Sequence, residues 1–223
     1  MIRSERISES MRLGTILTLS GGFLDAYSYM MRGKVFANAE TGNIVMMGVN
    51  IAEGDWPRVL HYFIPVASFA LGVAIAAMVE RKVGNRMRIH WKESVLWMEI
   101  ACVLLVGLMP QSLNMLANSM IAFICAMQVQ TFRKVRGKAF ATTMCTGNLR
   151  SGTELLTAGI FDGNKEKKHG SLHYYWIDFV FILGAAIGAG FCRLFSERAV
   201  WVCAALLLGA LAFIMYQKRG AEV

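Results

Sequence analysis

The chain has 223 residues, of which 56% are hydrophobic and 17% are charged, and its mean hydropathy is +0.46. A soluble domain of this length is less apolar and carries more charge, so the composition excludes an ordinary soluble protein. The net charge of +8 could indicate nucleic-acid binding. In so apolar a chain we expect no nucleic-acid partner, and the charges bear instead on orientation in a membrane.

Six apolar runs are candidates to cross a bilayer, which takes about 20 residues as a helix. The first is the least apolar because it contains Gly21, Gly22 and Asp25, and no convincing small-residue cleavage site follows it. We predict that it is a retained span and not a secretory signal. In chain order the runs are 13–31, 60–79, 94–109, 112–132, 172–192 and 199–216.

Two less apolar segments, 36–52 and 139–160, each contain Thr-Gly-Asn. The chain reads RGKVFANAETGNIVMMG over 32–48 and RGKAFATTMCTGNLRSG over 136–152. If both segments crossed the membrane there would be eight spans, and if neither crossed there would be six.

The basic residues distinguish these topologies. With six spans and a cytoplasmic N-terminus, 18 of the 23 lysines and arginines fall on the cytoplasmic side, among them Arg3, Arg6 and Arg86. Eight spans would place the basic segments 81–92 and 133–138 on opposite sides and lose most of this bias. The positive-inside pattern therefore predicts six spans with both termini in the cytoplasm.

The two motifs belong to a longer internal repeat. Arg32, Gly33, Lys34, Phe36 and Ala37 match Arg136, Gly137, Lys138, Phe140 and Ala141, and Leu60-His61-Tyr62 and Leu71-Gly72 match Leu172-His173-Tyr174 and Leu183-Gly184. We predict an all-α fold of two three-helix repeats, 1–110 and 111–223, in one membrane domain. Because each repeat has an odd number of spans, the second is expected to be inverted relative to the first, a design that recurs in transporters.

The repeated Thr-Gly-Asn motif predicts a re-entrant or broken-helix segment in each half. Glycine and asparagine would form the tip of a hairpin, and the returning arm would be a short helix whose N-terminus points inward. The alternative is an ordinary polar turn at the membrane surface. The candidate solute-binding residues of the two tips are Thr41, Gly42, Asn43, Thr146, Gly147 and Asn148.

Residues GGFLDAYSY, FANAETGN and TGNLRSG resemble the YoaK-like family of bacterial integral membrane proteins, a domain of unknown function. The resemblance extends over nearly the whole chain. It implies a multi-pass protein of the bacterial inner membrane, and it implies no activity, substrate or catalytic residue.

Three of the acidic residues in or beside the apolar runs are candidate site residues. Asp25 and Asp178 are candidates for coupling to a proton or cation, because carboxylates inside a membrane are costly and usually face a cavity or a partner. Each could instead make a structural hydrogen bond. Glu40, directly before the first Thr-Gly-Asn, either joins Asp25 in the solute site or reaches toward water.

The leading interpretation is a transporter or channel for a small polar or anionic solute, with its site where the two halves meet. The alternative is a non-transporting membrane scaffold or a lipid-interacting protein. The sequence has no P-loop, zinc-protease, hydrolase or dinucleotide motif, so we expect neither an enzyme nor a cofactor. Five scattered cysteines without a C-x-x-C pair indicate buried hydrophobes and no metal site. Membrane lipids are expected partners, and a homo-oligomer is possible.

Overall fold

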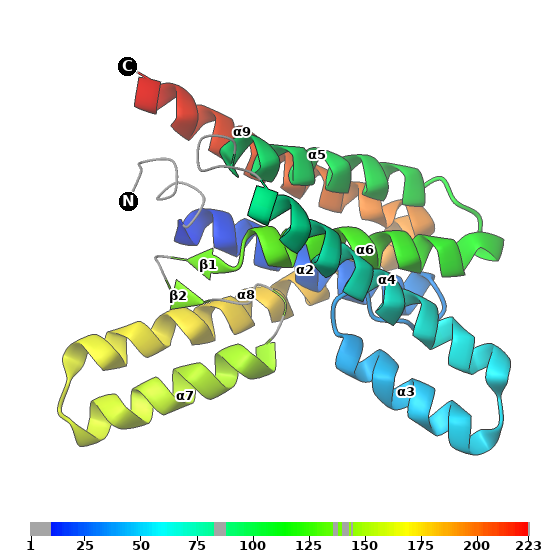
Figure 1. Ribbon diagram of the computed structural model, residues 1–223, viewed down its shortest axis with the longest axis horizontal. Coiled ribbons are helices and arrows are strands. Elements are labelled where there is room, and N and C mark those ends of the chain that lie inside the picture. Colours follow the sequence, from blue (N-terminus) through cyan, green and yellow to red (C-terminus); the bar gives the residue numbers. More distant parts are fainter. Residues whose placement is uncertain (1–9, 83–87, 136–137, 140–142, 144, 223) are drawn as a thin grey trace.

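The computed structural model describes residues 10–82, 88–135, 138–139, 143 and 145–222, and almost all of them are helical (Figure 1). Two short 3-10 helices, η1 (Gln111–Leu113) and η2 (Ser196–Ala199), and two paired strands, β1 (Lys134–Val135) and β2 (Lys138–Ala139), join some of the helices. The helices are α2 (Met11–Met31), α3 (Glu40–Glu53), α4 (Trp56–Lys82), α5 (Arg88–Val106), α6 (Asn114–Thr131), α7 (Cys145–Phe161), α8 (Lys165–Phe195) and α9 (Val200–Glu222).

Each of the six predicted apolar runs lies in a long helix, namely α2, α4, α5, α6, α8 and α9. Three segments of the described chain are long and apolar enough to cross a membrane: Trp56–Lys82, Gln111–Thr131 and Lys165–Lys218. The last has 54 residues and contains both α8 and α9, joined by η2. Helices α2 and α5 fall outside this set, since they contain charged residues such as Asp25 and Glu99. The prediction of an all-helical membrane protein is confirmed.

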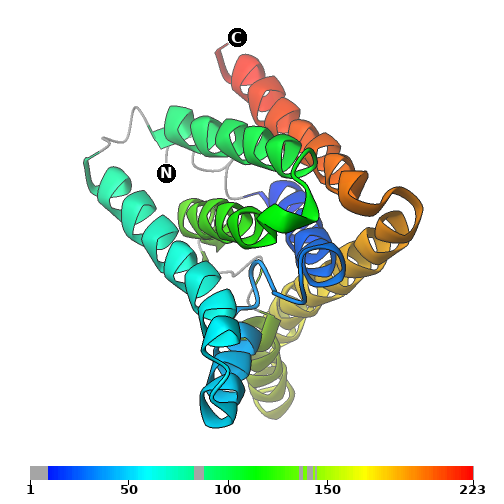
Figure 2. The same ribbon diagram turned by 90° about the vertical axis from the view of Figure 1, so that its right-hand side faces the viewer.

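Helices α2 and α6 lie at the centre of the molecule, and α4, α5, α8 and α9 surround them (Figure 2). The two central helices have different principal neighbours, since α2 packs mainly on α8 and α6 mainly on α4. Helix α5 contacts α6 and α9, and α9 also contacts α2. The main apolar core is formed by buried residues of α2, α5, α6 and α9, such as Leu17, Val103, Ile121 and Leu207.

Glycines allow these helices to approach each other closely. A Cβ atom added at Gly184 would lie 2.2 Å from the carbonyl oxygen of Leu19, and one at Gly188 would lie 2.9 Å from that of Phe23. The sequence Gly184-x-x-x-Gly188 therefore packs against α2 within the chain. On the opposite side, a Cβ at Gly72 would lie 2.3 Å from the carbonyl oxygen of Phe123 in α6.

The two helices that contain Thr-Gly-Asn, α3 and α7, begin in the interior and run toward opposite ends of the molecule (Figure 1). Helix α3 packs on α4, and α7 packs on α8. The start of α2 and the end of α9 lie at the same end of the bundle (Figure 1). Several residues used in the sequence argument lie outside the described residues: Arg3, Arg6, Arg86, Arg136, Gly137, Phe140 and Ala141.

Candidate functional site

Asp25 lies in the middle of α2 and binds the segment that leads into α3. Its Oδ1 atom accepts a hydrogen bond from the backbone N–H of Asn38 over 2.6 Å, and the amides of Ala37 and Ala39 lie close to the same carboxylate. The N-cap residue of α3 is Ala39, which has no side-chain oxygen to cap the helix. A carboxylate from another helix therefore binds the backbone amides just before α3, near a helix N-terminus that favours negative charge.

The approach segments of the two Thr-Gly-Asn helices meet at Gly21 of α2, one helical turn before Asp25. A Cβ atom at Gly21 would lie 2.7 Å from Thr143 Cγ2 and 3.9 Å from Asn38 Nδ2. Glu40, the first residue of α3, is near enough to Asp25 for the two carboxyl groups to interact electrostatically. We call Asp25, Asn38, Glu40 and Thr143 the central cluster.

The central cluster is largely buried but its hydrogen bonds are incomplete. Asp25, Asn38 and Thr143 are only 4%, 5% and 5% exposed, and Glu40 is half-buried. Among the described residues, no hydrogen-bond partner reaches Asp25 Oδ2, Asn38 Oδ1, Glu40 Oε1 or Thr143 Oγ1. Buried polar atoms without partners are uncommon and costly, at about 1–3 kcal/mol each, so their concentration at one place points to a ligand or water site.

Asn43 organises the first broken segment. Its Oδ1 accepts a hydrogen bond from the backbone N–H of Phe36, and its Nδ2 donates to Phe36 O over 2.7 Å and to Glu40 Oε2 over 2.8 Å. The motif does not form the turn that we predicted, because α3 begins at Glu40 and α7 at Cys145, so both Thr-Gly-Asn triplets lie within the first helical turns. Asn43 is fully buried and Asn148 is 3% exposed, which argues against turns at a polar surface.

In the second half the motif binds a different carboxylate. Asn148 Nδ2 donates to Asp178 Oδ1 on α8 over 3.2 Å, and the Cys145 side chain also hydrogen-bonds to Asp178. Asp178 thus accepts a hydrogen bond from the motif asparagine of α7, as Glu40 does from that of α3.

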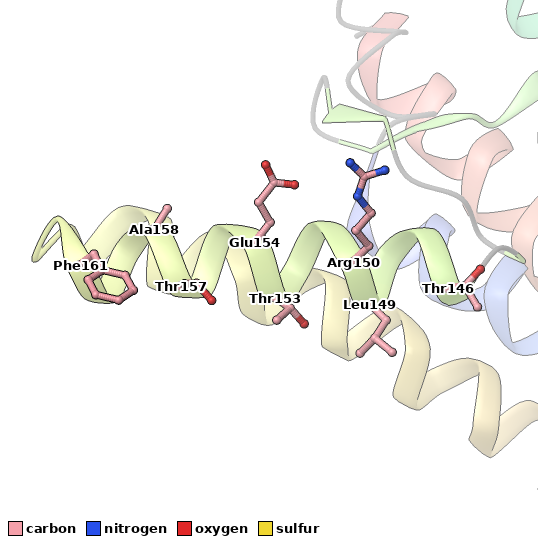
Figure 3. Close-up of a pocket in the computed structure, with 8 residues that line it drawn as sticks. All are labelled: Thr146, Leu149, Arg150, Thr153, Glu154, Thr157, Ala158 and Phe161. Carbon is pink, nitrogen blue, oxygen red and sulfur yellow. The ribbon is translucent and has the colours of Figure 1, made fainter.

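The remaining motif residues lie on the outer side of their helices. Thr41, Thr146 and Gly147 are exposed, and Gly42 packs against the Phe36 ring. Thr146 is at one end of an open groove of about 660 Å³, lined by residues of α7 alone: Thr146, Leu149, Arg150, Thr153, Glu154, Thr157, Ala158 and Phe161. Arg150 and Glu154 project from the same side of the helix, one turn apart (Figure 3).

Sequence reasoning missed several buried polar residues. Asn38 and Thr143 lie in connections, where polar residues are common, so no sequence signal distinguished them. Glu99 is different, because it is a carboxylate inside the predicted span 94–109 and could have been noticed. It is fully buried in α5, and both of its carboxyl oxygens accept from Gln128 Nε2, over 2.8 and 2.7 Å.

Arg32, at the end of α2, is another buried polar residue, and its partners show a structural role. Its side chain is fully buried and donates to the Tyr27 hydroxyl. Asn118 Nδ2 in turn donates to Arg32 O. The guanidinium also donates to oxygens between the end of α5 and the start of α6: Val106 O, Met109 O, Pro110 O and Asn114 Oδ1. Arg32 therefore binds three helices together at one end of the bundle.

Glu197 in η2 completes the polar network around Arg32. Its backbone carbonyl accepts a hydrogen bond from the Tyr27 hydroxyl over 2.9 Å. The Gln111 side chain donates to its carboxylate over 2.6 Å and holds the pKa of Glu197 below its usual range. In the described residues, no group of three or more histidine, cysteine or acidic side chains is placed to hold a metal ion.

Comparison with known proteins identifies the family of this chain. A family described as "Protein of unknown function (DUF1275)" matches residues 13–214. The UPF0700 transmembrane protein YoaK of Bacillus subtilis (strain 168) is 31% identical over 81 residues, which are 36% of this chain and 35% of that protein. The match thus spans about a third of the length of that relative. No solved structure matches. The chain is a membrane protein, and it belongs to the DUF1275 family of proteins of unknown function.

Proposed function

We propose that the chain transports a small polar solute across the bacterial inner membrane, as a carrier or a channel, through a site at the central cluster. The observation that carries this proposal is the set of unpartnered oxygens on Asp25, Asn38, Glu40 and Thr143, buried where the segments leading to α3 and α7 meet. A protein with only a structural role in the membrane would gain stability by pairing these atoms or by replacing them with apolar groups.

The proposed topology has six spans, α2, α4, α5, α6, α8 and α9, with α3 and α7 as re-entrant half-helices. Helices α3 and α7 have 14 and 17 residues, short of the approximately 20 that a full crossing takes. Their inner ends lie in the interior, and they leave toward opposite ends of the bundle (Figure 1). Because the start of α2 and the end of α9 lie at the same end, the charge bias assigns that end to the cytoplasm.

An inverted repeat is supported by the way the helices pair. The contact of α2 with α8 corresponds to that of α6 with α4 when the halves 1–110 and 111–223 are exchanged, and α3 with α4 corresponds to α7 with α8. Leu19 and Phe123 are 104 residues apart, as Arg32 and Arg136 are, and Gly72 and Gly184 are 112 apart, as Leu60 and Leu172 are. The close contacts of Gly184 with Leu19 and of Gly72 with Phe123 are thus equivalent under the repeat.

The proposal is tested by reconstituting the purified protein into vesicles. Solutes would first be screened for those that raise its unfolding temperature, and uptake of the stabilising solutes would then be measured. Thr143→Val is a suitable variant because it removes a hydroxyl oxygen that has no partner and should leave the fold intact. Uptake by the wild-type protein that Thr143→Val reduces supports a transport site here. Uptake that this variant and Asp25→Asn leave unchanged contradicts it.

The groove on α7 favours a second candidate, a membrane scaffold that binds a partner through this helix. Arg150 and Glu154 are exposed on a helix that packs mainly on α8, and the described residues that line the groove all belong to α7. Single cysteines at Thr153 and, as a control, at Phe63 on α4 would be tested for crosslinking in membranes. Crosslinks to another protein at 153 alone, without solute uptake by the purified chain, would favour the scaffold.

A further inference from the structure

The free atoms of the central cluster are all of one chemical kind. Asp25 Oδ2, Asn38 Oδ1, Glu40 Oε1 and Thr143 Oγ1 are oxygens, and no side-chain nitrogen of the cluster lacks a partner. The orientation of the Asn38 amide follows from its neighbour, because Nδ2 lies 3.4 Å from the carbonyl oxygen of Gly21. Exchanging the two amide atoms would bring two acceptors together, so the oxygen is the atom left free.

The backbone amides just before α3 already bind a carboxylate. The amide of Asn38 donates to Asp25 Oδ1 over 2.6 Å, and the amides of Ala37 and Ala39 surround the same carboxylate. These are the N–H groups that precede α3, and a helix N-terminus attracts negative charge. Because the protein places its own carboxylate beside these amides, an anion approaching this end of α3 would meet the negative charges of Asp25 and Glu40.

Among the residues that the structure describes, no lysine, arginine or histidine forms an ion pair with either acidic residue of the cluster. The ion pairs formed among the described residues involve Asp55, Glu93 and Asp162, and none includes Asp25 or Glu40. Asn43 donates to Glu40 Oε2, but an amide carries no charge. A buried carboxylate without a counter-charge is strongly unfavourable, and a bound positive charge would relieve this cost.

We propose that the central cluster binds a small cation, held by the carboxylate of Asp25 together with the oxygens of Asn38, Glu40 and Thr143. This assignment rests on the transport site proposed above and names its chemistry. Carboxylate, amide and hydroxyl oxygens are the ligands preferred by hard metal ions, and they equally accept hydrogen bonds from a protonated amine. The bound group is therefore either a monovalent metal ion or the ammonium group of the solute.

The test measures the unfolding temperature of the purified full-length protein in detergent. Sodium, potassium, ammonium or methylammonium chloride would replace choline chloride at constant ionic strength, so that chloride is unchanged. We expect one small cation to raise the unfolding temperature by several degrees relative to choline, which is too large for the cluster. Preference for sodium or potassium identifies a metal site, and preference for ammonium or methylammonium identifies an amine site.

Two variants connect the effect to the cluster. Asp25→Asn retains an oxygen to accept the Asn38 amide and removes only the charge, so it should abolish the shift. Thr143→Val should weaken the apparent affinity for the cation several-fold, without lowering the unfolding temperature in choline. This variant provides the test if Asp25→Asn does not fold. Asp178→Asn is the matched control, because Asp178 binds Asn148 outside the cluster and its substitution should leave the cation shift unchanged.

The outcomes separate this inference from the transport proposal. The absence of any cation-dependent shift, or a shift that Asp25→Asn and Thr143→Val both retain, overturns cation binding. Stabilisation by varied anions at constant choline, lost in Asp25→Asn, also overturns it. A cation shift in a protein whose vesicles take up no solute leaves the cation site standing and contradicts transport. Uptake of a solute without an amine group that is equal in all the cation chlorides supports transport and contradicts the cation site.

Discussion

Asn148 on α7 donates a hydrogen bond to Asp178 on α8, over 3.2 Å, whereas its counterpart Asn43 donates to Glu40, three residues earlier on its own helix, over 2.8 Å. The repeated asparagine thus binds a carboxylate in both halves, although the carboxylates occupy positions that do not correspond. Glu40 corresponds to Cys145, and Asp178 corresponds to Val66. The retained feature is the amide–carboxylate contact at the start of the short helix, and not the acidic residue itself.

This relationship predicts that the amide–carboxylate contact of the first half can be rebuilt in the second half by substitution. Asp178→Val copies Val66 and removes the acceptor of Asn148, which should lower the free energy of unfolding by about 1–3 kcal/mol. Adding Cys145→Glu should recover part of that loss, since a glutamate at 145 would stand three residues before Asn148, as Glu40 stands before Asn43. Thermal unfolding of the two single variants and the double variant gives the coupling energy. If the effects of Asp178→Val and Cys145→Glu on the free energy of unfolding are strictly additive, a glutamate at 145 does not replace Asp178 as the partner of Asn148.

The repeat also predicts equal effects at two glycines. Gly72→Ala would place a methyl group 2.3 Å from a carbonyl oxygen of a central helix, and Gly184→Ala would do so at 2.2 Å. Both substitutions should destabilise the protein, by about 1–3 kcal/mol, because the helices must separate. Gly190→Ala on α8 is the control, since no atom lies within 4 Å of its Cβ position and alanine favours a helix. A stable Gly184→Ala protein would contradict the close packing of α2 and α8.

The helices were predictable because long apolar runs identify membrane segments, but their ends were less so. Helix α5 begins at Arg88, earlier than the predicted start at 94, and contains Glu93, which pairs with Lys218 on α9 over 3.2 Å. Helix α8 begins at Lys165, before the predicted 172, because the Asn164 side chain caps it. Hydropathy detects the apolar part of such a helix and not its polar extension.

The site was predictable only in part. Asp25 stood out because a carboxylate is rare in an apolar run, whereas Asn38 and Thr143 belong to connections and meet at Gly21 only after folding. Thr41 and Thr146 share a motif with the asparagines but face outward. The motif could not indicate this, because side chains two positions apart on a helix point in different directions.

The buried arginine provides a prediction about stability. Arg32→Ala would leave Tyr27 Oη, Asn114 Oδ1 and the carbonyl oxygens beyond α5 without their donor, so we expect a loss of about 3 kcal/mol or more. Arg58→Ala is the control, because Arg58 is exposed and pairs only with nearby Asp55, an interaction worth about 1 kcal/mol or less. Similar unfolding temperatures for the two variants would refute a structural role for Arg32.

The hydrogen bond from Gln111 to Glu197 predicts a small dependence of stability on pH. Because the folded protein holds the pKa of Glu197 below its ordinary value of 4.5, this carboxylate contributes stability above that pH and loses it as the pH falls through the folded pKa. The contribution should be about 1 kcal/mol or less, since the group is partly exposed to water. We expect Glu197→Gln to lower the unfolding temperature slightly at neutral pH, and the difference from the wild-type protein to shrink as the pH falls through the folded pKa. A constant difference at all pH values would contradict this.

The topology predicts which residues can be labelled from each side of the membrane. In a variant without its five native cysteines, single cysteines would replace Gln111 and Glu197 at one end of the bundle and Lys167 and Lys218 at the other. A maleimide that cannot cross membranes should label positions 111 and 197 in intact cells, and positions 167 and 218 only after the membrane is opened. A cysteine at position 54, at the end of α3, should be labelled in intact cells like one at position 111, because a half-helix returns to the side from which its loop entered. Labelling of 54 together with 167 would mean that α3 crosses the membrane, and the six-span topology would then be wrong.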